Sequence, residues 1–360
     1  YGLSGSGAGC LSSCGVMGKP ASYYTELFAR LGGLLEGFGT VPETRAVAEA
    51  AVAANPWFTL SDVVFSVDAV RRNMLDAAVS ARWLSYYGAN ERTVRSRVAV
   101  IMAGNIPLVG LSDLLCVVAS DCIPYIKMSS KDSVLMEYVV GLLCGLAPGI
   151  RVERYVPEER YDAAIATGSD NTGRYFHALF DGIPSIIRGS RSSVALLTGE
   201  ETDGELHALG RDIFRYSGLG CRNVSLVFIP LDYDLARFVR AVAPPEEAVN
   251  PKYRNNYRSL RARLRAAGED FYDGGTFVVT VGDRFPVSLS NIVAFRYDRA
   301  EEVYGWLEAN DGAVQCVVGR DVVHPRAVGF GAAQMPWPWD YPDGTDVMAF
   351  LRALPEPGSR

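Results

Sequence analysis

The sequence has few histidines, no excess of positive charge and no long apolar run, and each shortage excludes a class of protein. Three histidines in 360 residues argue against a zinc site or a histidine-based triad. The 35 Lys and Arg residues are outnumbered by 41 Asp and Glu residues, so the basic surface of a nucleic-acid-binding protein is missing and no nucleic acid is expected as a partner. The most apolar stretch, residues 98–126, is interrupted by polar residues such as Asn105 and Asp113, so no membrane span is predicted.

Familiar nucleotide, metal and redox motifs are absent as well. No strand-to-helix junction carries G-x-G-x-x-G, and the chain has no Walker A sequence, no H-E-x-x-H and no C-x-x-C pair. The seven cysteines are odd in number and spread over the whole chain, a pattern typical of reduced thiols in a cytoplasmic protein. Cys10 and Cys14 lie in a Gly- and Ser-rich stretch, residues 1–20, which we interpret as a flexible lead or a trimmed or engineered end, with no specific role for either thiol.

Hydrophobic periodicity divides the rest of the chain into a helical part and an alternating part. Apolar residues recur three and four positions apart from Tyr23 to Gly88, which predicts a helical layer over residues 21–90. From Arg97 onward, short apolar runs alternate with helix-length segments, which predicts a parallel sheet with crossover helices. We expect two lobes that meet close to Gly218, with strands near 98–103, 122–126, 162–166, 193–197, 224–229, 277–281, 292–295 and 314–318.

Small, polar or charged residues follow the first three predicted strands. Because ligands bind outside the carboxyl ends of strands in open α/β sheets, these residues are candidates for a binding site. The turn from Gly168 to Gly173, with Ser169, suits the close approach of backbone N–H groups to a phosphate or ribose, and Lys127 suits a ribose hydroxyl or a 2′-phosphate. Each feature alone also fits an ordinary turn or a solvated side chain, and the Asn105 amide also fits local turn capping.

Cys221 differs from the other cysteines in its setting. Gly218 and Gly220 precede it closely, and it lies just before a predicted strand instead of inside an apolar run. Such glycines expose a thiol and let main-chain N–H groups point at a substrate oxygen, while Arg222 favours the thiolate. The sequence therefore makes Cys221 a candidate nucleophile with an exposed thiol, although this spacing also fits a structural cysteine.

Taken in order, these motifs resemble the aldehyde dehydrogenase superfamily, and more closely its acyl-CoA reductase branch, typified by the fatty acid reductase subunit of bacterial bioluminescence. The resemblance implies two Rossmann-like α/β lobes behind the N-terminal helical layer: a dinucleotide-binding lobe over residues 91–217 and a catalytic lobe over residues 218–325. A C-terminal segment, residues 326–360, is expected to pack back on the cofactor lobe. The resemblance runs from about Asn55 to Leu351 and rests on residues 104–108 (GNIPL), 127–132 (KMSSKD), 166–173 (ATGSDNTG), 218–225 (GLGCRNVS) and 339–344 (WDYPDG).

The resemblance also implies a role for each candidate residue. Cys221 corresponds to the nucleophile, and Asn105 to the asparagine whose amide helps the cysteine N–H stabilise the oxyanion. The superfamily binds its dinucleotide without G-x-G-x-x-G, which accounts for the missing fingerprint. The positions that match its cofactor contacts are Lys127 and Ser129, for the adenosine ribose, and Gly168, Ser169 and Gly173, for the loop packed on the cofactor.

One departure from the superfamily pattern bears on the reaction. Where hydrolytic members carry a Glu-Leu-Gly-Gly segment with their general base, this chain reads RGSRSS over residues 188–193. Without that glutamate, water is poorly activated against the acyl-enzyme, so thioester chemistry is favoured over oxidation to a free acid. Lys127 and Lys131 would suit a 2′-phosphate, so NADPH is expected, with NADH as the alternative, and no metal is required.

The expected function is therefore NADPH-dependent reduction of an acyl thioester, an acyl-CoA or another activated acyl donor, to the aldehyde. A reductase of acyl phosphates, similar to the glutamyl phosphate reductases, is the rival within enzymes. A non-catalytic acyl-carrier or partner-binding module is the rival from another class. Relatives commonly form dimers or larger assemblies, so the resemblance allows a homo-oligomer, although the sequence carries no self-association signal.

Overall fold

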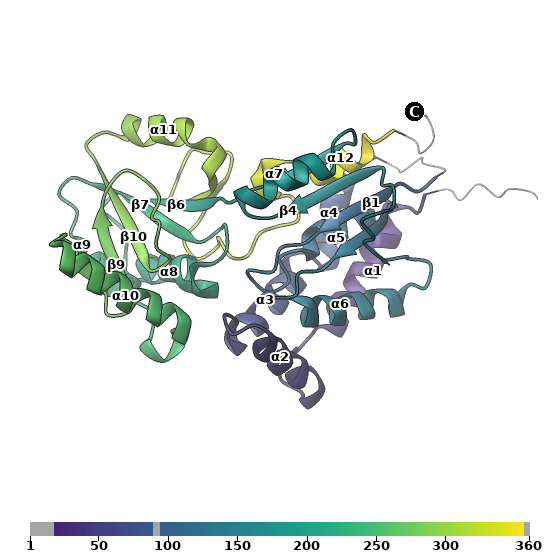
Figure 1. Ribbon diagram of the computed structural model, residues 1–360, viewed down its shortest axis with the longest axis horizontal. Coiled ribbons are helices and arrows are strands. Elements are labelled where there is room, and N and C mark those ends of the chain that lie inside the picture. Colours follow the sequence, from purple (N-terminus) through teal and green to yellow (C-terminus); the bar gives the residue numbers. More distant parts are fainter. Residues whose placement is uncertain (1–17, 89–93, 356–360) are drawn as a thin grey trace, which may run out of the picture.

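The computed structural model describes residues 18–88 and 94–355, so Cys10, Cys14 and nearly all of the predicted lead lie outside the described residues. Figure 1 shows two lobes side by side, each built on a β-sheet flanked by helices. No helix within the described ranges is long and apolar enough to cross a membrane.

Helices dominate the beginning of the described chain, as the periodicity predicts. Their apolar faces gather in one core, which includes Phe28, Leu31 and Trp83. Two of the helices begin at side-chain caps, because the Thr59 hydroxyl accepts from the Asp62 N–H and the Asp76 carboxylate from the Ala78 N–H. The helices are α1 (Ala21–Leu34), α2 (Pro42–Ala54), α3 (Leu60–Asn73) and α4 (Ala77–Ser85).

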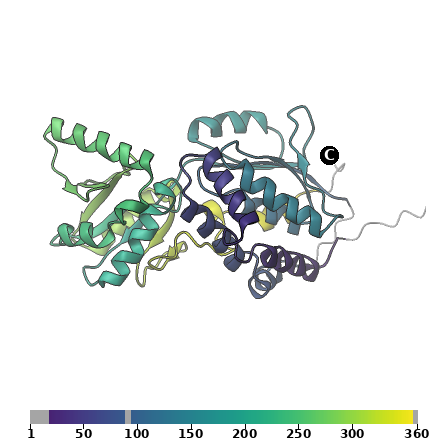
Figure 2. The ribbon, with the colours of Figure 1, turned by 90° about the horizontal axis from the view of Figure 1, so that it is seen from below.

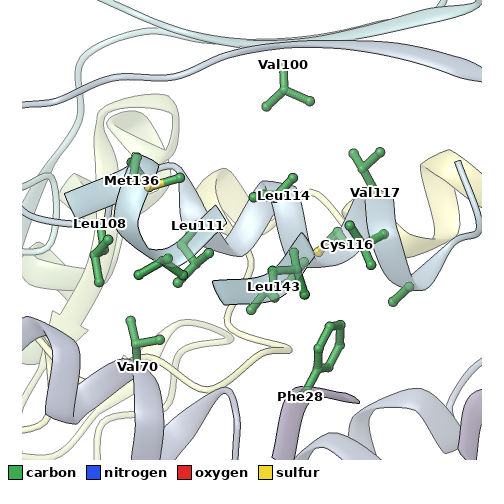
Figure 3. Close-up of a cluster of buried hydrophobic side chains, with 14 of the residues drawn as sticks. Phe28, Val70, Val100, Leu108, Leu111, Leu114, Cys116, Val117, Met136 and Leu143 are labelled. Atoms are coloured by element: carbon green, nitrogen blue, oxygen red, sulfur yellow. The ribbon is translucent and has the colours of Figure 1, made fainter. Parts of the chain in front are cut away.

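The first sheet is parallel throughout, with the strand order β3-β2-β1-β4-β5. Side chains alternate along β1, so Val98 and Val100 face the core of the N-terminal helices while Ala99 and Ile101 face the opposite core. In Figure 3, side chains of α5 lie between Val100 and the helical layer, to which Phe28 belongs. The elements are β1 (Arg97–Ile101), α5 (Leu111–Ala119), β2 (Ile123–Lys127), α6 (Ser133–Leu146), β3 (Glu153–Arg154), β4 (Ala163–Thr167), α7 (Asp170–Leu179) and β5 (Ser185–Arg188).

The second sheet has the order β12-β11-β6-β7-β10-β9-β8 and is parallel except where β8 meets β9. Helices α8 and α9 cover one face and α11 the other. The basic stretch after Lys252 forms a helix, α10, whose Leu260 and Leu264 pack against Val278. The elements are β6 (Ser192–Leu196), α8 (Asp203–Phe214), η1 (Arg215–Gly218), β7 (Val224–Pro230), α9 (Leu235–Val242), η2 (Glu246–Ala248), α10 (Pro251–Ala267), β8 (Tyr272–Asp273), β9 (Val278–Val281), β10 (Asn291–Tyr297), α11 (Ala300–Ala309), η3 (Asp311–Ala313), β11 (Val314–Val318) and β12 (Ala327–Val328).

The chain passes from the first sheet to the second between Arg188 and Ser192, which corrects the predicted boundary near Gly218. Strand β6 pairs with β7 and β11 of the second sheet. Helix α8 packs on that same sheet, so both elements lie outside the lobe to which the sequence assigned them. Alternation of strands and helices does not reveal which sheet a strand joins, because its hydrogen-bond partners are distant in sequence.

After β12 the chain returns to the first lobe, and Figures 1 and 2 show this yellow segment running between the two lobes. It includes η4 (Pro342–Gly344) and ends in α12 (Val347–Arg352), whose Met348 and Leu351 are buried in the core of the first lobe. The Trp83 indole N–H donates to the Tyr341 hydroxyl at 2.7 Å, which fixes this segment to α4.

Candidate functional site

Most of the predicted site residues line one cavity between the two lobes. This cavity, of about 450 Å³, lies at the carboxyl ends of β1, β4 and β5, and we call it the strand-end cavity. Its position agrees with the rule for open parallel sheets. The predicted residues that line it are Asn105, Ser129, Gly168, Ser169 and Cys221.

Two predicted residues lie elsewhere. Lys127 is exposed and lines a separate hollow of about 700 Å³ together with Arg154, whereas Lys131 lines the strand-end cavity. Gly173 lies in the first turn of α7, where its N–H donates to the Ser169 carbonyl at 2.8 Å. The structure therefore does not bring Lys127 and Ser129 to the same cavity.

A strained turn leads from α8 to Cys221. Tyr216 and Ser217 adopt positive φ angles of 56° and 55°, and Gly218 follows with a φ of 70°. The left-handed conformation costs roughly 1–3 kcal/mol for a residue other than glycine, and it persists only where surrounding structure enforces it. No local signal in the sequence marks Tyr216 and Ser217 for this conformation.

The side chain of Asn223 makes several of the hydrogen bonds that hold this strained turn. Its amide N–H groups donate to the carbonyls of Asp212, Ile213 and Arg215 at 2.9–3.1 Å, at the end of α8. Its carbonyl oxygen accepts from the Gly220 N–H at 2.8 Å. The buried Asn223 thus holds both sides of the loop that carries Cys221, a role that the sequence did not reveal.

Asn105 reaches the same loop from the first lobe. Its side-chain amide donates to the Leu219 carbonyl at 2.6 Å, so the bond spans the two lobes and is not local turn capping. A primary amide carries two N–H donors. One is used in this bond, which leaves the amide with a second N–H donor.

The Cys221 thiol is more buried than the sequence suggested. The side chain is only partly exposed, and burial raises the pKa of the thiol to about 11, although the Arg222 guanidinium acts to lower it. Arg222 donates instead to the Ala333 carbonyl at 2.6 Å. The expected exposed thiolate is corrected to a partly buried thiol that is protonated at neutral pH.

A second, smaller cavity of about 130 Å³ also reaches Cys221. We call it the helix-side cavity, because α3, α5 and the segment from Pro336 to Pro342 form its wall. Its lining is mainly apolar and includes Val70, Met74 and Trp337. The residues that line both cavities are Val109, Asp113, Cys221 and Pro342.

A buried ion pair forms part of the wall of the strand-end cavity. Arg188, which opens the RGSRSS segment, donates through Nη1 to Asp113 Oδ2 at 2.7 Å, and the two side chains are only 4% and 8% exposed. Arg188 Nε and Nη2 and Asp113 Oδ1 are buried and have no hydrogen-bond partner among the described residues. From the sequence, Asp113 stood out only as a break in an apolar run.

The strand-end cavity fits a nucleotide. Helix α7 begins there, since Gly168 and its N-cap Ser169 line the cavity, and a helix N-terminus favours a bound phosphate. Gly104 keeps room at the end of β1, since a Cβ at that position would lie 2.4 Å from Ser129 Oγ. Arg188 and Asp113 also line this cavity, and each carries buried polar atoms that have no partner among the described residues.

Comparison with known proteins identifies the fold. No family model and no curated protein sequence matches the chain. An oxidoreductase from Marinobacter aquaeolei is similar with a TM-score of 0.64 at 12% identity, covering 89% of this chain and 80% of that one. A variant of the P. syringae indole-3-acetaldehyde dehydrogenase, solved with NAD+, is similar with a TM-score of 0.63 at 15% identity, covering 85% of this chain and 73% of that one. Aldehyde dehydrogenase 21 from Physcomitrella patens is similar with a TM-score of 0.61 at 14% identity, covering 86% of this chain and 75% of that one. The chain therefore has the two-lobed aldehyde dehydrogenase fold, as the sequence resemblance implied.

Proposed function

We propose that this chain, whose fold is that of the aldehyde dehydrogenases, reduces an acyl thioester to an aldehyde with NADPH, through an acyl group carried on Cys221. The observation that carries the proposal is the position of Cys221. It is the thiol among the described residues that lines both the strand-end cavity and the mainly apolar helix-side cavity. An acyl chain in the helix-side cavity and a cofactor in the strand-end cavity would therefore meet at Cys221 Sγ.

Acylation is assigned to Cys221 and Asn105. Cys221 Sγ bonds to the thioester carbon, the bond from that carbon to the coenzyme A sulfur breaks, and the proton of the Cys221 thiol leaves with the released thiol. The Asn105 amide, held by its bond to Leu219, donates to the oxyanion that forms in between. The strand-end cavity would hold the nicotinamide, which when bound would supply the hydride for reduction of the acyl-cysteine. The tetrahedral oxyanion left on Cys221 would then collapse to the aldehyde and the Cys221 thiolate, and the thiolate would take a proton from solvent to regenerate the thiol.

The RGSRSS segment supports reduction over hydrolysis. A guanidinium keeps its proton at any accessible pH and does not act as a base for water. Arg188 also pairs directly with Asp113, the carboxylate that lines both cavities beside Cys221. The acyl-cysteine would therefore persist until the cofactor reduces it.

Positive charge at the end of β2 supports NADPH over NADH as the cofactor. Lys127 and Arg154 line the hollow beside that strand end, and together they suit a 2′-phosphate. Glu137 and Glu153 share the hollow, and Arg151 pairs with Glu153 at 2.8 Å, which offsets one of the two negative charges. In this arrangement Ser129, Gly168 and Ser169 would hold the ribose and phosphates.

The proposal is tested by loss of NADPH absorbance with acyl-CoAs from short to long chains, together with detection of the aldehyde. The wild-type protein is compared with Cys221→Ala and with Cys144→Ala, a partly exposed cysteine of α6 that lines none of the cavities near the site. Aldehyde formation that is lost in Cys221→Ala and kept in Cys144→Ala supports the proposal. A mass increase of one acyl group on Cys221 in the absence of NADPH supports the covalent step.

Two outcomes would overturn it. Turnover of acyl phosphates but of no acyl-CoA would assign the chain to acyl phosphate reduction. Absence of turnover with every donor, together with absence of NADPH and NADH binding, would favour a non-catalytic acyl-carrier or partner-binding module.

A further inference from the structure

The Arg188–Asp113 ion pair has hydrogen-bonding groups that the protein itself does not use. Arg188 Nε and Nη2 are donors, Asp113 Oδ1 is an acceptor, and all three are shielded from solvent without a partner among the described residues. Leaving a buried polar atom unpartnered costs about 1–3 kcal/mol, more for a charged group. Such an arrangement indicates that a bound group completes these bonds.

The position of the pair restricts what that group is. Asp113 is, apart from Cys221, the only polar side chain among the described residues that lines both cavities. A nicotinamide that delivers hydride must bring its reacting carbon within about 3–3.5 Å of the acyl carbon on Cys221. Its carboxamide is attached to the adjacent ring carbon and therefore lies close to the same junction.

The chemistry of the pair matches a primary carboxamide. A carboxamide presents one carbonyl acceptor and two N–H donors, whereas a simple anion presents acceptors only and would be repelled by Asp113 Oδ1. We propose that Arg188 donates to the carbonyl of the nicotinamide carboxamide and that Asp113 accepts from its N–H. This inference rests on the proposed function, and it makes Arg188 and Asp113 residues that orient the ring over Cys221. The small side-chain adjustment that brings the shielded atoms to the ring is common on binding.

The experiment compares the affinity of NADP+ with that of its nicotinic acid analogue, whose carboxylate replaces the carboxamide, in the absence of any acyl donor. Wild-type protein is expected to bind NADP+ at least about tenfold more tightly, since the analogue lacks the donor and faces Asp113 Oδ1. In Asp113→Asn that preference is expected to fall below about threefold or to reverse, because Arg188 is then free to pair with the carboxylate.

A matched control is Asp121→Asn. Asp121 is also buried and paired with an arginine, Arg95, at 3.1 Å, but it lines neither the strand-end nor the helix-side cavity. Its substitution carries the same loss of charge, and it should leave the preference for NADP+ unchanged. An unchanged preference in folded Asp113→Asn overturns the inference.

A second ligand keeps the test decisive if Asp113→Asn does not fold. The 3-acetylpyridine analogue of NADP+ keeps the carbonyl and lacks the N–H donor, so wild-type protein should bind it about tenfold more weakly than NADP+. Equal affinities overturn the inference while leaving the proposed reductase intact. If wild-type protein binds neither NADP+ nor NADPH, the proposed function itself fails, and the inference fails with it.

Discussion

The Asn105 side-chain amide donates to the Leu219 carbonyl at 2.6 Å and so joins the end of β1 in one lobe to the Cys221 loop of the other. The two residues are 114 positions apart in sequence. Under the proposed function, this bond would fix the Asn105 amide relative to the Cys221 loop before a substrate arrives, as oxyanion stabilisation requires.

Replacing Asn105 by alanine should therefore act mainly on the chemical step. We expect Asn105→Ala to lower kcat for acyl-CoA reduction by about 10²–10³-fold with little change in KM, because an oxyanion donor acts in the transition state. Asn291→Ala removes an amide that pairs with Thr280 in the second sheet and serves as the control. An increase in KM with kcat unchanged would show that Asn105 contributes to ground-state binding instead.

The pH dependence of Cys221 alkylation tests its environment. Since burial raises the pKa of the thiol to about 11, the reactive thiolate is the minor form below that pH, and its fraction increases about tenfold per pH unit. Labelling with iodoacetamide, followed at the Cys221 peptide, should accelerate steadily from about pH 7 to about pH 10 without levelling off. Levelling off near pH 8.5, the ordinary value for cysteine, would contradict the structure.

The Lys127 and Arg154 side chains should determine the choice of cofactor. Removing either with Lys127→Ala or Arg154→Ala should weaken NADPH binding about tenfold, since a hydrogen bond between charged groups contributes about 1.5 kcal/mol or more. NADH affinity should stay the same, because NADH has no 2′-phosphate. Titration of both cofactors against each variant provides the measurement, and equal losses for NADPH and NADH would refute the assignment.

Gly104 should tolerate no side chain. A Cβ there would lie 2.4 Å from Ser129 Oγ and 2.5 Å from its Cβ, so Gly104→Ala should lower the free energy of unfolding by about 1–3 kcal/mol and weaken cofactor binding. At Gly141, on α6, a Cβ would meet no atom within 4 Å, and Gly141→Ala should stabilise the protein by about 0.5–1 kcal/mol. Chemical denaturation of both variants distinguishes the two effects, and a neutral Gly104→Ala would contradict the close approach.

The Tyr341 hydroxyl should contribute to docking of the C-terminal segment. It accepts from the buried Trp83 indole at 2.7 Å and also bonds to the Tyr87 hydroxyl at 2.7 Å. Tyr341→Phe leaves the Trp83 N–H without this acceptor, so the free energy of unfolding should fall by about 1–3 kcal/mol. Tyr304, which is exposed on α11, provides a control, since Tyr304→Phe should have no measurable effect in the same denaturation experiment.

The sequence by itself determined most of the elements, although its pattern did not mark the strands β3, β5, β8 and β12. Period-two and period-3.6 patterns depend on neighbouring residues, so the N-terminal helices, the strands from β1 to β11 that the pattern marked, and the motifs around Asn105, Gly168 and Cys221 were all accessible to it. Five ordered motifs also indicated the fold.

Only the tertiary structure decided how these pieces meet, because each remaining feature depends on a partner far away in the chain. The assignment of β6 to the second sheet rests on its pairing with β7 and β11. The raised pKa of the Cys221 thiol results from burial, which a local pattern does not report. Arg188 and Asp113 are 75 residues apart, and nothing in either local sequence indicates that folding brings them together beside Cys221.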